Sequence, residues 1–199
     1  MISLARGGSP LVALVVWAVC CREERAAGVG TPALQRRDAD MSLPRRRHLR
    51  RLDRVFDEAR APLYYLTCCV HNRMRVLARP GVAEVLQTAW REAEEVHGWL
   101  VGRFVVMPDH VHFFASPVGD AEKSLSRFVE SWKQWTQRGI RQRGLASFRW
   151  QKEFFDHLLR GEESYEGKWQ YVRENPVRAE LVITPEQWPY QGEIHVLAW

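Results

Sequence analysis

The sequence predicts an α+β domain in which an antiparallel β-sheet is flanked by helices. Three features indicate this fold class: an aromatic, β-branched segment at 63–70, two similar segments joined by a tight turn at 99–116, and amphipathic stretches between and after them. The length of 199 residues suits one domain with a real core, and the hydrophobic content of 46% argues against disorder. We therefore expect one folded domain without disulfide staples.

The strands are predicted from residue type and from the turn residues that separate them. Residues 63–70 (LYYLTCCV) are suited to a strand that ends at His71. The segments 99–107 and 110–116 flank Pro108-Asp109, a dipeptide that favours a tight turn. These two segments should therefore form an antiparallel hairpin.

The first helix is predicted from the spacing of apolar residues. Between Val82 and Val96 the apolar positions recur three or four residues apart, which places them on one helical face. Gly98 follows, and glycine is a common helix terminator. We expect one helix over 81–98.

Two more helices are expected in the second half of the chain. The apolar positions of 125–139 predict an amphipathic helix, which a basic, glycine-punctuated loop at 138–144 should follow. A short aromatic segment covers 148–155. The third helix should cover 162–175, because Pro176 disfavours helical geometry in the residue before it.

The chain divides into three parts by composition. Residues 1–40 are expected to lie outside the folded domain, 41–60 to form a basic arm, and 61–199 to form the domain. The apolar run at 11–21 is too short for a membrane span, which needs about 20 residues. We favour translation from Met41; an export signal in the first 40 residues is the alternative.

The positive charge is concentrated in the arm. The formal net charge is +5, and residues 41–54 carry six arginines against one aspartate, so this segment holds the whole surplus. Such an arm indicates a polyanion partner, most simply nucleic acid. A solvated leader without a partner is the alternative.

The cysteines occur as two adjacent pairs, Cys20-Cys21 and Cys68-Cys69. Neither pair has the spacing of a zinc ribbon or of a thioredoxin-like site. Neighbouring strand residues point to opposite faces, so Cys68 and Cys69 are expected to be packed thiols of a reducing compartment. We predict a cytoplasmic protein without a membrane segment.

Two histidines and a tyrosine suggest metal-assisted chemistry. On a strand, His110 and His112 face the same way and form a pair of metal ligands. Tyr171 and Asn175 are four residues apart, so they share one helical face. Asn175 offers a hard oxygen ligand for Mg²⁺ or Mn²⁺, and Tyr171 offers a hydroxyl nucleophile. Taken singly, each motif is also common in purely structural positions.

Together, these motifs resemble those of a known family. The segments 105–112 (VVMPDHVH) and 169–179 (WQYVRENPVRA) look like the paired signatures of the HUH-type single-tyrosine transposases, in their REP-associated tyrosine transposase branch. Trp150-Gln151, 154–157 (FFDH) and Arg160 extend the resemblance, which covers roughly 44–197. Glu180 departs from it, since the family usually has glycine there.

The resemblance implies a fold and a reaction. The fold would be the ferredoxin- or RRM-like HUH palm. His110, His112 and Asn175 would bind Mg²⁺ or Mn²⁺, and Tyr171 would attack single-stranded DNA next to a palindromic hairpin, giving a 5′-phosphotyrosine intermediate that is later rejoined. His157 and Asp109 would contact the metal ligands and not the metal ion itself. A monomer is favoured over a swapped dimer.

The resemblance and the charge pattern also imply which residues contact DNA. The expected contacts are Arg45, Arg46, Arg47, Arg50, Arg51, Arg138, Arg141, Arg143, Arg160, Arg173 and Arg178. Trp132 and Trp135 are candidates for base stacking, with core packing preferred for Trp132. Two alternatives to the transposase remain: a domesticated, non-catalytic DNA-hairpin-binding protein, and a phosphodiesterase that uses water.

Overall fold

The computed structural model describes residues 61–119, 124–159 and 165–197. Within them, five strands form one sheet with the order β4-β1-β3-β2-β5, and every neighbouring pair is antiparallel. The strands are β1 (Tyr64–Cys69), β2 (Trp99–Val106), β3 (His110–Pro117), β4 (Phe155–Leu158) and β5 (Gln191–Glu193). The predicted antiparallel α+β fold, with its hairpin and its first strand, is confirmed.

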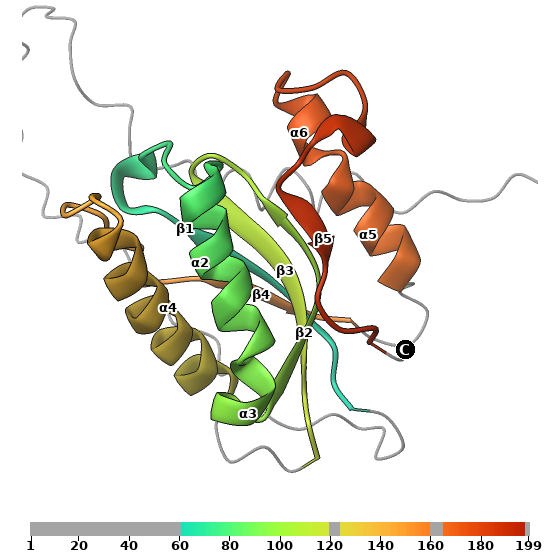
Figure 1. The fold of residues 1–199 in the computed structure, drawn as a ribbon. Helices are drawn as coiled ribbons and strands as arrows, with labels where there is room; N and C mark the ends of the chain where they lie inside the picture. The colour runs from blue at the N-terminus through green and yellow to red at the C-terminus, as the bar shows by residue number, and fades with distance from the viewer. Residues whose placement is uncertain (1–60, 120–123, 160–164, 198–199) are drawn as a thin grey trace, which may run out of the picture. The chain divides into compact units, whose positions relative to one another are not determined.

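Helices cover both faces of this sheet. One face carries α2 (Pro80–Arg91), α3 (Ala93–His97) and α4 (Leu125–Gln142), whereas α5 (Tyr165–Arg173) lies on the other side, followed by α6 (Asn175–Arg178) (Figure 1). Short 3₁₀ turns occupy η1 (His71–Arg73) and η2 (Pro185–Gln187). The two faces bury separate hydrophobic clusters.

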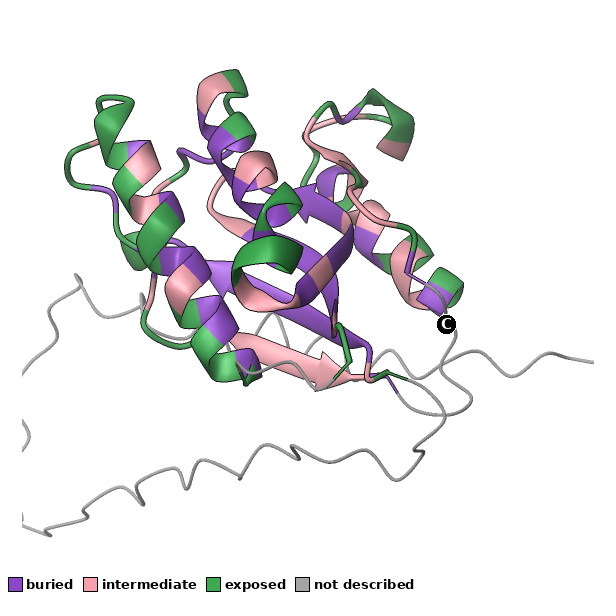
Figure 2. Cartoon of the chain, turned by 60° about the horizontal axis from the view of Figure 1, so that its bottom comes forward, coloured by how far each residue is buried: buried purple, intermediate pink, exposed green. Residues whose placement is uncertain are grey.

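The central strands are buried on both faces. All six residues of β1 are buried, and alternate side chains enter alternate clusters: Leu66 and Cys68 pack under α2 and α4, whereas Tyr65 packs under α5. The edge strand β4 is only half-buried (Figure 2). Cys68 and Cys69 are buried side chains of β1, as predicted, and Sγ of Cys69 accepts a hydrogen bond from Nη1 of Arg73 at 2.9 Å.

The first predicted helix is divided in two. α2 ends at Arg91 and α3 begins at Ala93, with a turn at Glu92 between them. Gly98 closes α3 with a φ of 68°, as predicted. Val96 lies on α3 and is 54% exposed, so the predicted apolar face of a single helix does not extend to it.

The second helix is longer than predicted. α4 continues through Gly139 to Gln142, so the loop expected at 138–144 is mostly helix. Gly139 lies at the contact with α2, where a Cβ atom would stand 2.8 Å from Cγ1 of Val85. It allows close helix packing rather than ending the helix, and Gly144, with a φ of 92°, follows the true end.

The third helix is shorter than predicted. α5 ends at Arg173, and Asn175 begins α6 after a turn at Glu174. Pro176 lies in the first turn of α6, where the N–H that proline lacks has no intrahelical partner to lose. Tyr171 and Asn175 therefore belong to two consecutive helices, not to one.

The strand β5 was not predicted, and β4 was anticipated only as a short aromatic segment. Among the described residues, no helix combines the length and the apolar character needed to cross a bilayer. The leader at 1–40, the arm at 41–60 and Arg160 lie outside the described residues.

Candidate active site

Two histidine side chains converge on the face of the sheet that α5 covers. His110 and His112 are alternate residues of β3, so they share a face. Their Nε2 atoms lie 3.1 Å apart. His112 is buried and His110 is partly exposed, so one imidazole is fixed inside the domain while the other reaches the surface.

Both imidazoles are held through the ring nitrogen that points away from the partner. Nδ1 of His112 is 2.8 Å from the hydroxyl of Tyr65 and 2.9 Å from that of Thr67, which is its partner in the β1–β3 register. Nδ1 of His110 is 2.6 Å from Oδ1 of Asp109. If each Nδ1 carries the proton, each Nε2 keeps a lone pair for a metal ion.

Asp109 connects His110 to a basic side chain. Its Oδ2 is 2.9 Å from Nε of Arg73, which follows Asn72 in the turn after β1. Asn72 and Arg73 have φ values of 53° and 50°, an uncommon left-handed pair next to the site. Burial raises the pKa of Asp109, but the hydrogen bond and charge of His110 and the charge of Arg73 outweigh burial, and the net pKa is lowered.

The environment of His112 favours a neutral imidazole. Burial, followed by the charges of His110, Arg178 and Arg73, lowers the pKa of His112 well below its usual value. A neutral imidazole is the form that binds a metal ion. The charge of Arg178, on α6, is one of the contributions to the lowered pKa of His112.

The tyrosines of α5 have opposite environments. Tyr165 is buried, its hydroxyl accepts a hydrogen bond from the backbone N–H of Arg103, and burial raises its pKa to about 12. Tyr171 is 42% exposed. Of these two phenols, only that of Tyr171 is accessible to a macromolecular substrate.

Asn175 and Tyr171 are linked by one guanidinium group. Nη2 of Arg178 donates to Oδ1 of Asn175 at 2.7 Å and to the backbone oxygen of Tyr171 at 2.6 Å. The Arg178 Cζ atom is 4.3 Å from the centroid of the Tyr171 ring. The break before Asn175 therefore does not separate the two predicted functional side chains.

The donor set fits a small divalent ion. Two imidazole Nε2 atoms 3.1 Å apart suit ligands of a single ion, because each would then lie about 2.1 Å from it. Among the described residues, no group of three or more His, Cys, Asp or Glu side chains could hold a metal ion. The amide oxygen of Asn175 is a further hard donor that suits such an ion.

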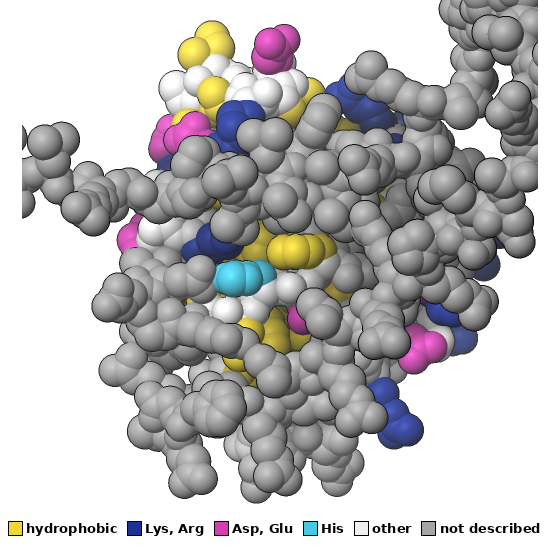
Figure 3. Space-filling model, turned by 180° about the vertical axis from the view of Figure 1, so that it is seen from behind, with side chains coloured by type: hydrophobic (Ala, Val, Ile, Leu, Met, Phe, Trp, Pro, Cys, Tyr) yellow, Lys and Arg dark blue, Asp and Glu magenta, His cyan; other side chains and the backbone are white. Residues whose placement is uncertain are grey.

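His157 lies on the edge strand of the same face. It pairs with Tyr65 in the β1–β4 register, whereas Phe155 is the residue in line with Thr67 and His112. His157 is half-buried. Viewed from behind, the surface shows a histidine side chain next to a basic and a hydrophobic side chain (Figure 3).

The predicted DNA-contacting arginines that the structure describes are not gathered on one surface. Arg138, Arg141 and Arg143 belong to α4 and its end, on the other side of the sheet from α5 (Figure 1). Arg141 donates to the Phe148 carbonyl, and Arg143 pairs with Glu84.

The remaining two arginines, Arg173 and Arg178, lie near Tyr171; Arg173 pairs with Glu186. The two tryptophans of α4 differ, since Trp132 is buried in the core, as expected, and Trp135 is 44% exposed.

Several contacts around the site were not predicted from the sequence. Thr67 and Tyr65 hold His112, Arg73 holds Asp109, and Nζ of Lys168 lies 5.2 Å from the centroid of the Tyr65 ring. The sequence offered one local indication of these contacts: Thr67 places a short hydroxyl side chain in a mostly apolar strand.

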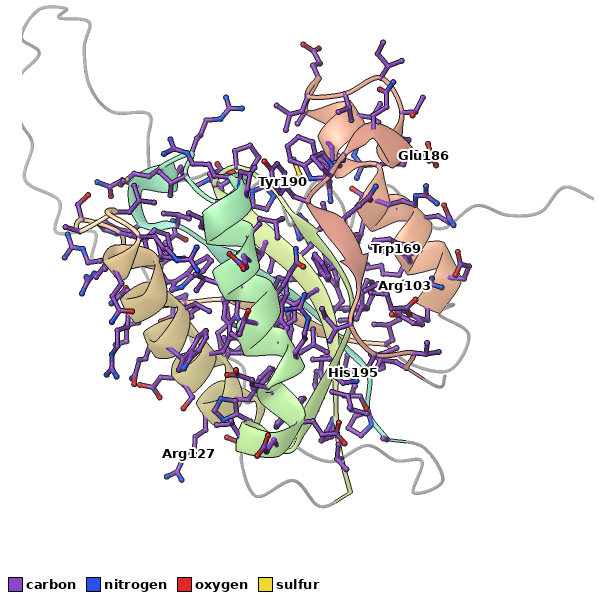
Figure 4. All side chains as sticks on the ribbon, viewed as in Figure 1. Arg103, Arg127, Trp169, Glu186, Tyr190 and His195 are labelled. Carbon is purple, nitrogen blue, oxygen red and sulfur yellow. The ribbon has the colours of Figure 1, made fainter. Side chains whose placement is uncertain are left out.

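Arg103, a residue of β2, connects α5 to the sheet. Its guanidinium lies 5.1 Å from the ring centroid of Tyr165 and 5.6 Å from that of Trp169, and it pairs with Glu166 and Glu193. Figure 4 shows Arg103 and Trp169 side by side between the sheet and α5. The helix that carries Tyr171 is thus held against the sheet of its own chain.

Comparisons with known proteins agree with this architecture. The chain matches the family described as "Transposase IS200 like" over residues 61–175. It is 22% identical over 145 residues to a Haemophilus influenzae protein named "Putative REP-associated tyrosine transposase", covering 68% of this chain and 82% of that protein. It is also similar to the solved structure of a REP-associated tyrosine transposase bound to a REP hairpin, with a TM-score of 0.55 and 20% identity over 66% of this chain and 76% of the other.

The family match extends over more than half of the chain, from the start of the described domain to Asn175. It includes the histidine pair and Tyr171, and the predicted resemblance to REP-associated tyrosine transposases is confirmed. The chain therefore belongs to the IS200-like transposase family.

Proposed function

We propose that this protein cleaves and rejoins single-stranded DNA next to palindromic hairpins, with Tyr171 as the nucleophile. The proposal rests on two features of the site. The Nε2 atoms of His110 and His112 converge, and the exposed phenol of Tyr171 lies next to Arg178. Arg178 also bonds to Asn175, the candidate third ligand. The solved relative was bound to a REP hairpin, which supports a DNA hairpin as the partner here.

The reaction is a transfer of one phosphodiester bond. The Tyr171 phenol loses its proton, and its oxygen attacks the scissile phosphorus. A P–O bond to tyrosine forms while the P–O3′ bond breaks, and the departing 3′-oxygen takes up a proton. The 5′ end of the DNA is then attached to Tyr171, and attack by a 3′-hydroxyl reverses the step and rejoins DNA. Bond energy is conserved, so no nucleotide cofactor is required.

A divalent ion would be held by His110 and His112 through Nε2, with Asn175 as the third ligand. Bound Mg²⁺ or Mn²⁺ would supply charge stabilisation at the scissile phosphate. The protein's own contribution is orientation. Tyr65, Thr67 and Asp109 fix the two imidazoles, and burial keeps His112 neutral.

The packing of α5 supports a monomer in which Tyr171 and the histidine pair of the same chain form one active site. Tyr165 and Val172 of α5 belong to one hydrophobic cluster with Tyr65 and Val105 of the sheet. A swapped dimer would have to replace these contacts. Buried cysteines such as Cys68 and Cys69 are compatible with a cytoplasmic location.

Covalent capture of DNA tests the function. The purified protein is incubated with a labelled hairpin oligonucleotide and Mn²⁺, and a denaturing gel separates protein–DNA adducts. The adduct is expected with the unmodified protein and with Tyr190→Phe, and it should be lost in Tyr171→Phe while hairpin binding persists. An adduct in Tyr171→Phe would exclude Tyr171 as the nucleophile.

Two other gel results would favour a different function for this protein. Hairpin binding without any cleavage by the unmodified protein would indicate a non-catalytic hairpin-binding protein. Cleavage without an adduct would indicate a phosphodiesterase that uses water.

A further inference from the structure

Arg178 closes the end of the helix that carries Tyr171. The last four carbonyl groups of an α-helix have no intrahelical donor, and Tyr171 lies within the last four residues of α5. Nη2 of Arg178 supplies a donor by bonding to the Tyr171 carbonyl at 2.6 Å. The same nitrogen bonds to Oδ1 of Asn175 at 2.7 Å. One guanidinium therefore fixes the backbone of Tyr171 and the amide of Asn175.

The same group lies over the ring of Tyr171. The distance from Cζ to the ring centroid is 4.3 Å, within the range of a cation–π contact. Tyr171 is 42% exposed, so core packing does not fix the direction of its phenol. The guanidinium of Arg178 is therefore placed to limit the orientations of this ring.

We propose that Arg178 is a positioning residue for the cleavage reaction: it orients the Tyr171 phenol relative to Asn175 and the histidine pair. The proposal rests on the proposed function, since it assigns a role within the tyrosine reaction.

Arginine is suited to this role in a way that lysine is not. Its planar guanidinium can stack on a ring and donate two hydrogen bonds from the same plane. A lysine keeps the charge and can donate to one or both oxygens, but it cannot keep the same planar contact. Arg178→Lys therefore keeps the positive charge but loses the planar contact that orients the phenol, whereas Arg178→Ala loses both the charge and the contact.

The test compares the rate of adduct formation with DNA affinity. Single-turnover rates are measured with saturating hairpin oligonucleotide and Mn²⁺, and affinity is measured by gel shift. We expect Arg178→Ala to lower the rate about 100-fold, because small misplacements of a reacting group have effects of this size. Affinity should change less than about threefold. Arg178→Lys should recover only a minor part of the rate.

Chemical rescue distinguishes local positioning from a structural defect. Added methylguanidinium should raise the rate of Arg178→Ala at least tenfold and leave Arg178→Lys unchanged. Arg127→Ala is the matched control, because Arg127 is an exposed arginine of α4, remote from α5 in the labelled view (Figure 4). It should keep the full rate.

Three results would overturn the proposal: a normal rate in Arg178→Ala, a loss of hairpin affinity equal to the loss of rate, or a rate that methylguanidinium does not restore. Each presupposes that the unmodified protein forms the Tyr171 adduct. Absence of that adduct would instead overturn the proposed function, so the two failures are distinguishable.

Discussion

The hydroxyl of Tyr65 lies 2.8 Å from Nδ1 of His112, although the two residues are 47 positions apart in the chain. Tyr65→Phe removes this contact and leaves Thr67 as the remaining partner of Nδ1. We expect Mn²⁺ affinity to fall about tenfold, at the lower end of the effect of losing a residue that orients a metal ligand. Electron paramagnetic resonance titration of free Mn²⁺ measures this without any DNA.

Tyr64→Phe is the control for that measurement, because Tyr64 is the preceding residue of β1 and faces the other hydrophobic cluster. Its Mn²⁺ affinity should equal that of the unmodified protein. The combined change of Tyr65→Phe and Thr67→Val should lower the affinity further, by about 100-fold in total. Unchanged affinity in the double variant would show that these hydroxyls do not support the ligand.

Arg103 should contribute to the stability of the domain through α5. Its guanidinium contacts the rings of Tyr165 and Trp169 and pairs with two carboxylates. Arg103→Ala is expected to lower the free energy of unfolding by about 1–2 kcal/mol, mostly from the cation–π contacts, since partly exposed ion pairs contribute little. Urea unfolding measures this.

Hydrogen exchange locates the effect of Arg103→Ala. Amides of α5 should exchange faster than in the unmodified protein, while those of α4 should not change. In Arg127→Ala, the change in unfolding free energy should stay within about 0.5 kcal/mol, as for most exposed positions. A uniform increase in exchange across the domain would contradict a local role in holding α5.

The contact of Gly139 with Val85 can be tested by a double-variant cycle. A Cβ atom at position 139 would stand 2.8 Å from Cγ1 of Val85, so Gly139→Ala alone should be destabilising by about 1 kcal/mol or more. In the background of Val85→Ala, the added methyl group has space, and the higher helix propensity of alanine should make the same change stabilising by up to about 1 kcal/mol. Equal effects in both backgrounds would exclude the steric explanation.

This glycine also shows why parts of the fold could not be predicted. When only the local sequence is considered, a glycine within an amphipathic pattern indicates the end of a helix. Here the glycine is needed because α2 packs closely against it, and the local sequence does not show where α2 lies. The break between α5 and α6 has a similar origin: Pro176 is compatible both with the end of one helix and with the first turn of the next.

The site was predictable to the extent that strand geometry determines it. The two-residue period of a strand places His110 and His112 on one face, and the turn residues Pro108 and Asp109 define the hairpin. The partners of His112 depend instead on the register between β1 and β3, and local sequence does not encode it. Tyr65 and Thr67 therefore entered the site only with the structure, whereas Arg178, predicted as a DNA contact, was there found to contact Tyr171 and Asn175.

Tyr165 should make the stability of the domain depend on alkaline pH. Burial raises its pKa to about 12, whereas the pKa of an unfolded tyrosine is about 10. Between these values the folded state holds a proton that the unfolded state has lost, so stability is complete below pH 10 and decreases as the pH rises through this window. Urea unfolding at pH 9.5 and pH 11.5 should show a smaller decrease in Tyr165→Phe. Tyr171→Phe, which removes an exposed phenol, should keep the decrease of the unmodified protein.

The basic arm should determine most of the salt dependence of DNA binding. Arg141 and Arg143 already bond within the domain, to the Phe148 carbonyl and to Glu84, so they have fewer donors for phosphates. The arm variant replaces Arg45, Arg46, Arg47, Arg50 and Arg51 by glutamine. Each lost phosphate contact should lower the slope of log affinity against log salt by roughly 0.7–0.9. The slope should fall by several units in the arm variant and by less than about one unit in Arg141→Gln combined with Arg143→Gln. Equal slopes in the two variants would show that the domain, not the arm, carries the phosphate contacts.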